Sequence, residues 1–344
     1  MGIRQNKKLR RELLALGISL VLLAGILAFL SVLLTPKRHN YGSTWGHYLA
    51  EPEQSIDVLV LGSSLAYCDV VPAVFYRDAG LSAYVMAGGE QTIPMSYYYL
   101  EECLKTQSPQ VVFLEITGVF YPRYTGFTKI NVGAMPLGRA RLEATFREAE
   151  PELRAGLLFP LLFYHDRWKE LTWEDLRYTF GAYEPDLLAG YTYLAQYRPM
   201  DAIGVRELQA DSENVARSCE YLLRLYQLCR SREIIPVFYV APVAKRVPAQ
   251  AMDAVKADLR ALDGCCVVDF NDAGTFENIG LDLAEDFYDA LHLNLSGAVK
   301  FTAAMAAWEE EKLGLTSACT EETLWQSRED RLTQLQQQPV RPAQ

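Results

Sequence analysis

The stretch that most constrains the fold is residues 56–64, which read Ile-Asp-Val-Leu-Val-Leu-Gly-Ser-Ser. Five of the six residues before Gly62 are apolar, which is typical of a β-strand buried on both faces in a parallel sheet. Gly62 permits a tight turn directly after this strand. The turn leaves the hydroxyls of Ser63 and Ser64 at the carboxyl end of the strand, where open α/β sheets bind their ligands.

Similar apolar runs recur along the chain and alternate with helical patterns. We expect further strands at 83–87, 111–117, 235–243 and 266–270, and helices at about 72–80, 94–105, 213–231, 250–262 and 296–312. This alternation predicts an α/β fold of three layers, with a parallel sheet of about five strands between helices. The predicted domain covers residues 55–315 and follows a connector at 36–54.

The amino-terminal residues have a different character. Residues 13–35 carry no charge, and at about 1.5 Å per residue this helix would exceed the roughly 30 Å hydrocarbon core of a bilayer. A cleaved signal peptide is the alternative, but its apolar core would span only about 7 to 15 residues and precede a small-x-small site, which residues 33–37 lack. We therefore predict an uncleaved, single-pass membrane anchor at 13–35. The five basic residues in 1–12 predict a cytoplasmic amino terminus and an extracytoplasmic main domain.

Charge divides the chain at the same place. Residues 1–39 carry seven basic side chains and one acidic side chain, whereas the remainder carries 26 basic and 42 acidic ones, a net charge of −16. Such an acidic domain is a poor candidate for binding nucleic acid. The seven cysteines lack metal-ligand spacing, so we expect no metal or other cofactor and interpret most of them as small buried hydrophobes.

Residues 118–200 interrupt the alternation of strands and helices. They are rich in Tyr, Phe, Trp, Arg and Pro, and about 80 residues are too many for a crossover helix alone. We expect an insertion that lies over the carboxyl edge of the sheet. Its aromatic residues either stack on sugars or pack a small core of the insertion itself. Beyond it, residues 316–344 are polar and predict a loose carboxyl-terminal tail.

A second group of candidate catalytic residues lies far downstream, at Asp289-Ala290-Leu291-His292. Residues three apart on a helical turn share a face, so this short segment can present a carboxylate and an imidazole to one hydroxyl. An imidazole can take the proton of a serine near neutral pH, and a carboxylate fixes its tautomer. We assign Ser64 as nucleophile, His292 as base and Asp289 as orienting acid. The alternative for Ser64 is structural, since serines also cap helices.

Acyl transfer also requires N–H donors for the oxyanion that develops on the substrate. The backbone N–H of Ser64 can supply one donor. A second can come from Gly88 or Gly89, which end the second predicted strand beside the first.

These blocks resemble those of the SGNH/GDSL hydrolases, a family with a flavodoxin-like sheet. The matching blocks are Gly-Ser-Ser-Leu at 62–65 for the family's Gly-Asp-Ser-Leu, Gly-Gly at 88–89, and Asp-x-x-His at 289–292. The resemblance covers most of residues 56–300 and implies the triad assigned above.

One departure from the family pattern concerns its third block, usually Gly-x-Asn-Asp, whose asparagine is an oxyanion donor. Here the third strand leads into Glu-Ile-Thr-Gly at 115–118, which leaves Thr117 as the candidate donor. Both this departure and the sequence Tyr-His-Asp-Arg-Trp-Lys-Glu-Leu at 164–171 are similar to features of a membrane-anchored branch of the family. That branch includes DltD-like D-alanyl transfer proteins and exopolysaccharide O-acetylation proteins. We accordingly consider His165, Arg167 and Gln91 as substrate-binding candidates, although a histidine in an aromatic region is often merely packed.

Two classes of function follow. In the first, the protein is a membrane-anchored serine esterase or O-acyltransferase that moves an acetyl or D-alanyl group on or off a cell-envelope polysaccharide or teichoic acid through an acyl-enzyme. Water and a sugar hydroxyl both remain open as acceptors. In the second, it is a non-catalytic SGNH-fold scaffold, which the missing asparagine favours. The resemblance implies a membrane-bound O-acyltransferase as partner.

Overall fold

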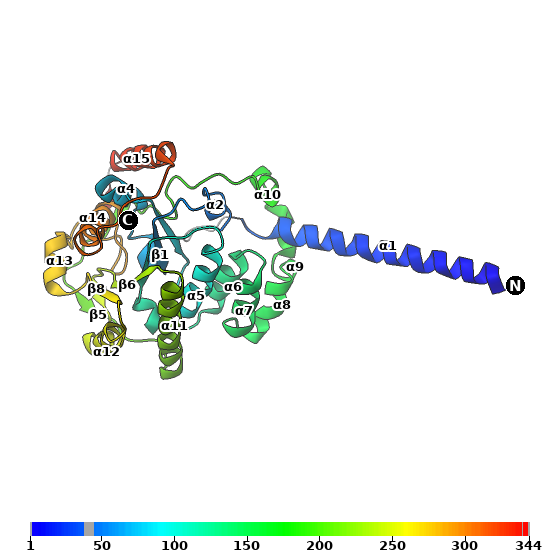
Figure 1. Ribbon diagram of the computed structural model, residues 1–344, viewed down its shortest axis with the longest axis horizontal. Helices are drawn as coiled ribbons and strands as arrows, with labels where there is room; N and C mark the ends of the chain where they lie inside the picture. The colour runs from blue at the N-terminus through cyan, green and yellow to red at the C-terminus, as the bar shows by residue number, and fades with distance from the viewer. Residues whose placement is uncertain (1, 38–44, 339, 343–344) are drawn as a thin grey trace.

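The computed structural model describes residues 2–37, 45–338 and 340–342, and its centre is a sheet of five parallel strands (Figure 1). The strand order is β2-β1-β3-β6-β8. The strands are β1 (Val58–Gly62), β2 (Ala83–Ala87), β3 (Val111–Glu115), β6 (Ile235–Val240) and β8 (Cys266–Asp269). The predicted α/β fold with a parallel sheet of about five strands is confirmed.

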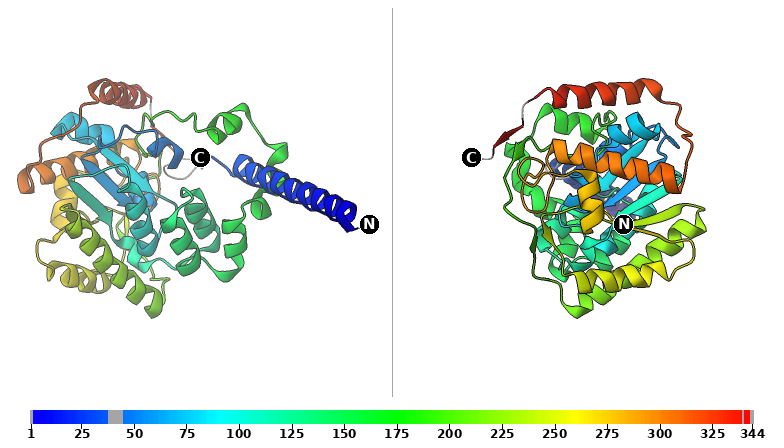
Figure 2. Two further views of the ribbon diagram at one scale, coloured as in Figure 1. Left: turned by 45° about the vertical axis from the view of Figure 1, so that its right-hand side comes forward. Right: turned by 90° about the vertical axis from the view of Figure 1, so that its left-hand side faces the viewer.

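Alternate residues of the strands enter two separate hydrophobic cores, one on each face of the sheet. In β1, Leu59 and Leu61 point to one core, whereas Val58 and Val60 point to the other. This is why the strands are continuous apolar runs rather than alternating ones. Helices cover both faces (Figure 2), so the sheet is the middle of three layers.

Helices form the two outer layers, and those of eight or more residues follow the predicted positions closely, whereas the two shorter ones were not predicted. One face packs on α5 (Ile93–Cys103), α11 (Ser212–Ser231) and α12 (Ala249–Arg260), and the other on α3 (Ser64–Tyr67), α4 (Pro72–Ala79), α13 (Ala273–Ile279) and α14 (Leu295–Lys312). The seven cysteines are all free.

The insertion after β3 folds mainly as short helices. They are η1 (Thr117–Phe120), α6 (Thr125–Ala134), α7 (Arg139–Arg147), α8 (Pro151–Leu158), α9 (Leu161–Tyr164), η2 (His165–Lys169) and α10 (Trp173–Thr179). The insertion begins at the carboxyl edge of the sheet, as predicted, but α7 packs along α5 and α9, η2 and α10 contact α1 (Gly2–Leu34). The chain then returns along the free edge of β2, where the Val85 N–H donates to the Ala189 carbonyl at 2.9 Å.

The amino-terminal helix α1 projects from the domain as a single long rod (Figure 1). Its segment Lys8–Leu34 is long and apolar enough to cross a membrane, which agrees with the predicted span at 13–35. Its orientation in a membrane stays a prediction. Residues 38–44, which include His39 and much of the predicted connector 36–54, lie outside the described residues; the connector's end forms α2 (Trp45–Tyr48).

The prediction of a loose tail at 316–344 is wrong for its central part, because α15 (Glu322–Gln336) packs on α4. Trp325 of α15 stacks on Tyr76, with ring centroids 5.1 Å apart. The Arg328 guanidinium forms an ion pair with Glu51, and both side chains are 1 % exposed. The helix was missed because a few apolar residues, spread among many polar ones, pack against the domain.

Two small sheets complete the fold. The pair β4 (Gln196–Tyr197) and β9 (Arg341–Pro342) lies near the carboxyl terminus. The pair β5 (Gly204–Val205) and β7 (Lys245–Arg246) lies next to the segment 289–292, since the Lys245 N–H donates to the Ala290 carbonyl at 2.9 Å.

Candidate active site

Ser64 is the first residue of α3 and follows a turn that only glycine allows. Gly62 has a φ of +152°, and a Cβ added there would lie 2.8 Å from the Cβ of Glu115 and 3.1 Å from that of Ala66. Any larger residue would therefore push β3 or α3 away. Ser63 caps α3, accepting a hydrogen bond from the Leu65 N–H at 3.4 Å. The turn thus leaves the Ser64 hydroxyl at the carboxyl edge of the sheet.

The carboxylate and the imidazole come from a tight loop before α14. The loop is closed by an antiparallel bridge between Phe287 and Leu293, and the Tyr288 N–H donates to the His292 carbonyl at 2.9 Å. Within it, Asp289 Oδ1 accepts from the N–H groups of Leu291 at 2.8 Å and His292 at 3.0 Å. These bonds fix Asp289 so that its carboxylate faces the ring three residues later.

The structure brings the three predicted catalytic side chains into one hydrogen-bonded chain. His292 Nε2 lies 2.8 Å from Ser64 Oγ, and His292 Nδ1 lies 3.0 Å from both carboxylate oxygens of Asp289. When Nδ1 carries the proton and donates it to Asp289, Nε2 can accept the proton of Ser64. The geometry therefore permits general-base activation of the Ser64 hydroxyl.

Asp289 has the charge that this arrangement needs. Burial opposes ionisation of its carboxyl group, but hydrogen bonds from the His292 ring and from the Leu291 and His292 N–H groups outweigh burial and lower its pKa. Asp289 is therefore anionic at neutral pH. An anion at Nδ1 stabilises the imidazolium that forms when His292 takes a proton.

Asp69 is a buried residue near the triad that sequence reasoning did not select. Its Oδ1 accepts from the Leu293 N–H at 2.9 Å, which ties the loop of His292 to the chain just after α3. Its other oxygen is buried, with no hydrogen-bond partner among the described residues. Burial raises the pKa of Asp69 well above its usual range. A signal was present, since Asp69 is the one acid within the apolar run 65–75.

The glycine pair predicted as an oxyanion donor lies beside the nucleophile turn. Gly62 pairs with Ala87 in the sheet, so Gly88 follows at the level of Ser63. Asn131, which sequence reasoning missed, holds this segment by donating from Nδ2 to the Gly89 carbonyl at 3.0 Å. A Cβ at Gly88 would lie 2.3 Å from Asn131 Oδ1, so the segment needs glycine there. The donor roles of Ser64, Gly88 and Gly89 stay predictions.

The assignment of Thr117 as an oxyanion donor is not supported by its contacts. Its N–H donates to Glu115 Oε1 at 2.8 Å, and its hydroxyl also bonds this carboxyl group. Glu115 is buried at the end of β3, and burial raises its pKa to about 7 despite these bonds. The hydrogen-bond donors of Thr117 are therefore engaged by the Glu115 carboxyl group and do not point to a role with an oxyanion at Ser64.

Three further residues lie near the triad and were not predicted as site residues. The Tyr121 hydroxyl lies 3.3 Å from Ser63 Oγ, and the Arg206 guanidinium lies 5.5 Å from the Tyr121 ring centroid. Glu90 follows the glycine pair with a φ of +45°. Burial raises the pKa of Glu90, while the nearby charges of Arg206 and His292 oppose the rise. A carboxylate and a guanidinium thus lie beside the candidate site.

The substrate-binding candidates lie away from the Ser64 hydroxyl or face inward. Gln91 is 1 % exposed and donates from Nε2 to Ser96 Oγ at 3.0 Å, so it supports the glycine segment from within. Arg167 pairs with Asp175 and donates to the Leu34 carbonyl at 3.3 Å, which places it at the end of α1. His165, on the same 3-10 helix, is exposed and has Asp166 as its charged neighbour at 3.6 Å. The structure therefore does not bring His165 or Arg167 to the triad.

A parallel α/β fold with a Ser-His-Asp relay at the carboxyl edge of its sheet has the geometry of a serine-hydrolase-type site. Over the described part of the chain, no group of three or more His, Cys, Asp or Glu side chains is placed to hold a metal ion.

Comparisons with known proteins add no family assignment. No protein-family model matches the sequence, and no curated protein matches it. A solved structure from Bacteroides fragilis, provisionally assigned as an acylhydrolase, is similar at 11 % identity and a TM-score of 0.39, covering 79 % of this chain and 99 % of that chain. A TM-score below 0.5 carries no argument, so the functional conclusions rest on the geometry of the chain itself.

Proposed function

We propose that the protein is a membrane-anchored, extracytoplasmic serine esterase or O-acyltransferase that acts through an acyl-enzyme. The observation that carries the proposal is the relay from Ser64 Oγ through the His292 ring to Asp289, with contacts of 2.8 and 3.0 Å. A serine at the end of a purely structural turn would not need a base and an acid aligned behind it.

The relay supports a two-step reaction. Ser64 Oγ attacks the acyl carbonyl carbon while His292 Nε2 takes the hydroxyl proton, and the resulting tetrahedral intermediate collapses when His292 returns that proton to the leaving alcohol. The acyl group is then bound to Ser64 as an ester. Water or a sugar hydroxyl then attacks this ester while His292 takes its proton, and His292 returns that proton to Ser64 Oγ as the bond between Oγ and the acyl carbon breaks, which gives hydrolysis or transfer respectively.

For the substrate, we propose an acetyl or D-alanyl ester of a cell-envelope polysaccharide or teichoic acid, with a membrane-bound O-acyltransferase as partner. The support is the block resemblance described above and a domain that is acidic overall but carries both Glu90 and Arg206 beside the relay. An ester of modest size on a neutral or zwitterionic polymer suits such a mixed-charge entrance better than nucleic acid does.

A fluorophosphonate probe tests whether the site is active. We expect labelling of the folded protein at Ser64 and none in Ser64→Ala, because the probe reacts only with a serine that its base has activated. The second candidate function is a non-catalytic scaffold, which is favoured by the engagement of Thr117 with Glu115. Absence of label on the folded wild type, with a control hydrolase labelled in parallel, would select the scaffold.

The proposed topology has its own test. Protease added to spheroplasts should remove a tag at the carboxyl terminus and spare a tag at the amino terminus, because the basic residues before the span favour a cytoplasmic amino terminus. The reverse pattern would overturn the extracytoplasmic placement without bearing on the chemistry of Ser64.

A further inference from the structure

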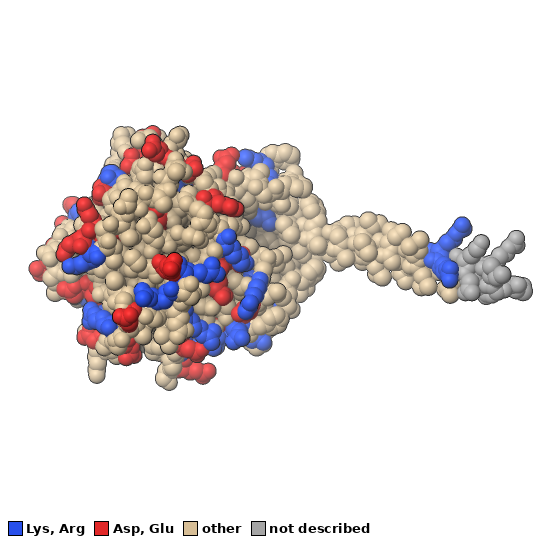
Figure 3. Space-filling model, in the orientation of Figure 1, with Lys and Arg blue, Asp and Glu red and all other residues tan. Residues whose placement is uncertain are grey.

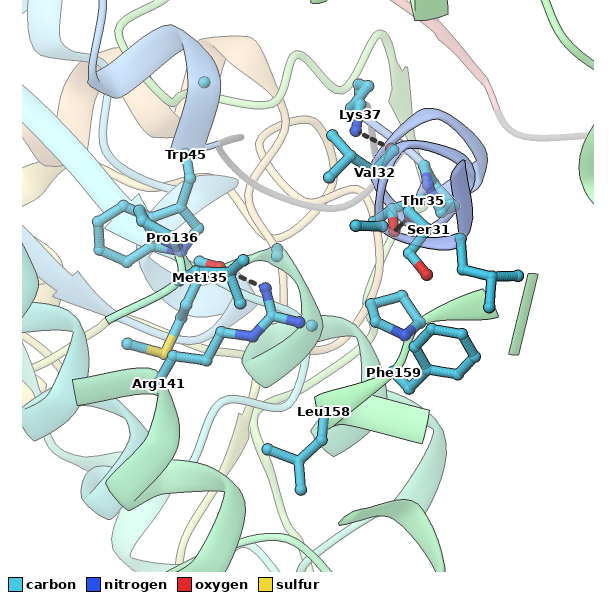
Figure 4. Close-up of a pocket in the computed structure, with 18 of the residues that line it drawn as sticks. Ser31, Val32, Thr35, Lys37, Trp45, Met135, Pro136, Arg141, Leu158 and Phe159 are labelled. Carbon is cyan, nitrogen blue, oxygen red and sulfur yellow. Dashed lines mark hydrogen bonds between the residues drawn. The ribbon is translucent and has the colours of Figure 1, made fainter. Parts of the chain in front are cut away.

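A large cavity lies far from the triad, where the last turns of α1 meet the insertion (Figure 4). Its volume is about 580 Å³, within the range of roughly 300–1,000 Å³ that is usual for small-molecule sites. It is lined by Ala24, Leu27 and Ala28 of α1 and by residues of the domain that include Trp45 and Phe159. Most of its wall is therefore apolar, and part of that wall is the membrane-spanning helix itself.

A buried cation forms part of the wall without a counter-ion. Arg141 is 7 % exposed and donates to the carbonyls of Met135 at 2.8 Å and Leu157 at 3.0 Å. No carboxylate in the described part of the chain pairs with it. Burial accordingly lowers the pKa of Arg141. An uncompensated charge in an apolar wall is costly, so this site is better satisfied when an anion occupies the cavity.

Two more polar groups face the same space. The hydroxyl of Ser31 is buried, with no hydrogen-bond partner among the described residues, and in Figure 4 it lies across the cavity from Arg141. Lys37 lies above it and donates to the Val32 carbonyl. Burial, and then the nearby charge of Arg167, lowers the pKa of Lys37 to about 8. The cavity thus combines apolar walls with an electropositive side.

The surface around the cavity mouth is unusually apolar for an exposed surface. Large hydrophobic side chains of the insertion remain exposed there: Leu137, Leu158, Leu162, Trp168, Trp173 and Phe180, a set we call the apolar collar. Most of the collar lies on α8–α10 and η2, of which α9, η2 and α10 contact α1, and Figure 3 shows few charges where the helix leaves the domain. Aromatic residues concentrated beside a membrane span are typical of contact with the bilayer interface.

We propose that this cavity binds one acyl chain of an anionic phospholipid from the leaflet next to the domain, with its phosphate facing Arg141 and Lys37. The lining runs from Ala24 of α1 to Thr35, directly after the helix ends, about 16 Å at about 1.5 Å per residue, or about half of the roughly 30 Å hydrocarbon core. The cavity therefore reaches about one leaflet deep. The inference rests on the membrane anchorage of the proposed function and is independent of its acyl chemistry.

A transmembrane helix of a partner protein is the other occupant to consider. A helix is a cylinder about 10 Å wide, so 580 Å³ holds only about 7 Å of it, or roughly five residues. A helix also brings no anion to Arg141 unless it carries an acid at membrane depth, which is costly. A single lipid chain with a phosphate satisfies both the volume and the charge.

Quenching of Trp45 fluorescence by brominated lipid tests the site in the full chain. The background is Trp168→Phe/Trp173→Phe, because these exposed collar tryptophans would otherwise respond to any bilayer, while Trp308 and Trp325 lie in the domain. The protein is placed in phosphatidylcholine nanodiscs with one-tenth phosphatidylglycerol brominated on its acyl chains. We expect at least a twofold loss of Trp45 emission that unbrominated phosphatidylglycerol reverses.

Two helix substitutions form a matched pair. Ala28→Phe fills the cavity from α1 and should abolish the Trp45 quenching, whereas Gly25→Phe, three residues away with nothing within 4 Å of an added Cβ, should leave it unchanged. Equal effects of the two substitutions on Trp45 quenching would overturn the proposal. So would an absence of quenching in the parent protein, which is the result expected if the natural occupant is a partner helix.

Arg141→Gln tests recognition of the anion. The quenching titration gives the apparent affinity for brominated phosphatidylglycerol and for brominated phosphatidylcholine. We expect the ratio of these two affinities to fall by at least about fivefold in Arg141→Gln. Should Arg141→Gln fail to fold, Lys37→Gln tests the same preference on a more exposed group. Equal quenching by the two lipids in the parent protein would refute the phosphate contact.

These experiments distinguish the lipid site from the proposed enzyme activity of Ser64. Ser64→Ala should bind lipid like wild type, because the cavity shares no residue with the relay. Conversely, Ala28→Phe should keep wild-type labelling by fluorophosphonate. An inactive Ser64 with intact quenching would reject only the enzyme, and a labelled Ser64 without quenching would reject only the lipid site.

Discussion

His292 Nε2 lies 2.8 Å from Ser64 Oγ, although the two residues are 228 positions apart in the sequence. The sheet places the hydroxyl at the carboxyl end of β1, and the loop before α14 brings the ring to it. The contact is direct and needs no rearrangement of the loop, so the site has the geometry of a ready acid–base pair.

Removing either partner of this contact should abolish turnover while leaving the fold intact. We expect Ser64→Ala and His292→Ala each to lower kcat for a chromogenic acetyl ester by at least about 10³-fold, because the nucleophile and its base act as a unit. The thermal midpoint should stay within a few degrees, since both side chains lie at the surface end of the sheet. A variant that fails to fold would show that the residue has a structural role.

Asp69 should act on catalysis through the loop of His292. Asp69→Ala leaves the Leu293 N–H without its acceptor, and the resulting shift of the neighbouring ring should lower kcat/KM by about 10²-fold. Asp69→Asn has nearly the same shape and keeps an acceptor oxygen for the Leu293 N–H, so it should restore most of the activity. Ester hydrolysis by the two variants, compared at equal folded fraction, checks this. Equal losses in both would mean that the carboxyl group itself is required.

Much of the fold was predictable because it depends on local sequence. Each central strand is an apolar run that needs no distant partner to identify it, and the Asp289-x-x-His292 segment is a local pattern as well. The helix α15 was not predictable in this way, since its stability depends on Arg328 meeting Glu51, 277 positions away. Polar composition alone gives no sign of such a contact.

The parts of the site that sequence missed depend on distant contacts too. Asp69 matters because it meets Leu293, and Arg206 because the short pair of β5 and β7 brings it beside Tyr121. Thr117 was chosen by analogy with an asparagine position, but the sequence does not show that the Glu115 carboxyl group would be buried and would take its donors. Local motifs therefore located the relay, and tertiary contacts determined what surrounds it.

Deleting residues 1–36 should give a folded domain, because α1 contacts the rest of the chain only at its last turns. With the apolar collar still exposed, we expect this domain to elute as a monomer in mild detergent and to retain esterase activity. Size-exclusion chromatography and circular dichroism check the result. Failure to obtain folded protein under any condition would mean that the domain needs the helix or a membrane partner.

The buried pair of Arg328 and Glu51 should make α15 a stabilising element. Both side chains are 1 % exposed, so Arg328→Ala leaves the Glu51 carboxyl group buried without its partner and should cost about 3–5 kcal/mol in the free energy of unfolding. Denaturant unfolding of the variant measures this. Arg331→Ala is the control on the same helix, where Arg331 makes an exposed hydrogen bond to Gln334; it should change stability by less than about 0.5 kcal/mol.

Glu115 should make the domain less stable as pH rises. Burial raises the pKa of its carboxyl group to about 7 in the folded state, from 4.5, so between these values the folded protein binds more protons than the unfolded chain. The contribution of Glu115 to the free energy of unfolding is therefore complete below about pH 4.5, where it amounts to roughly 3 kcal/mol. It is lost as the pH rises from that value through about 7. Glu115→Gln, which keeps an acceptor for the Thr117 N–H, removes this dependence. Urea unfolding at pH 5 and pH 8 should show a stabilisation by Glu115→Gln that is larger at pH 8; parallel pH profiles for wild type and variant would show that the Glu115 carboxyl group does not titrate in this range.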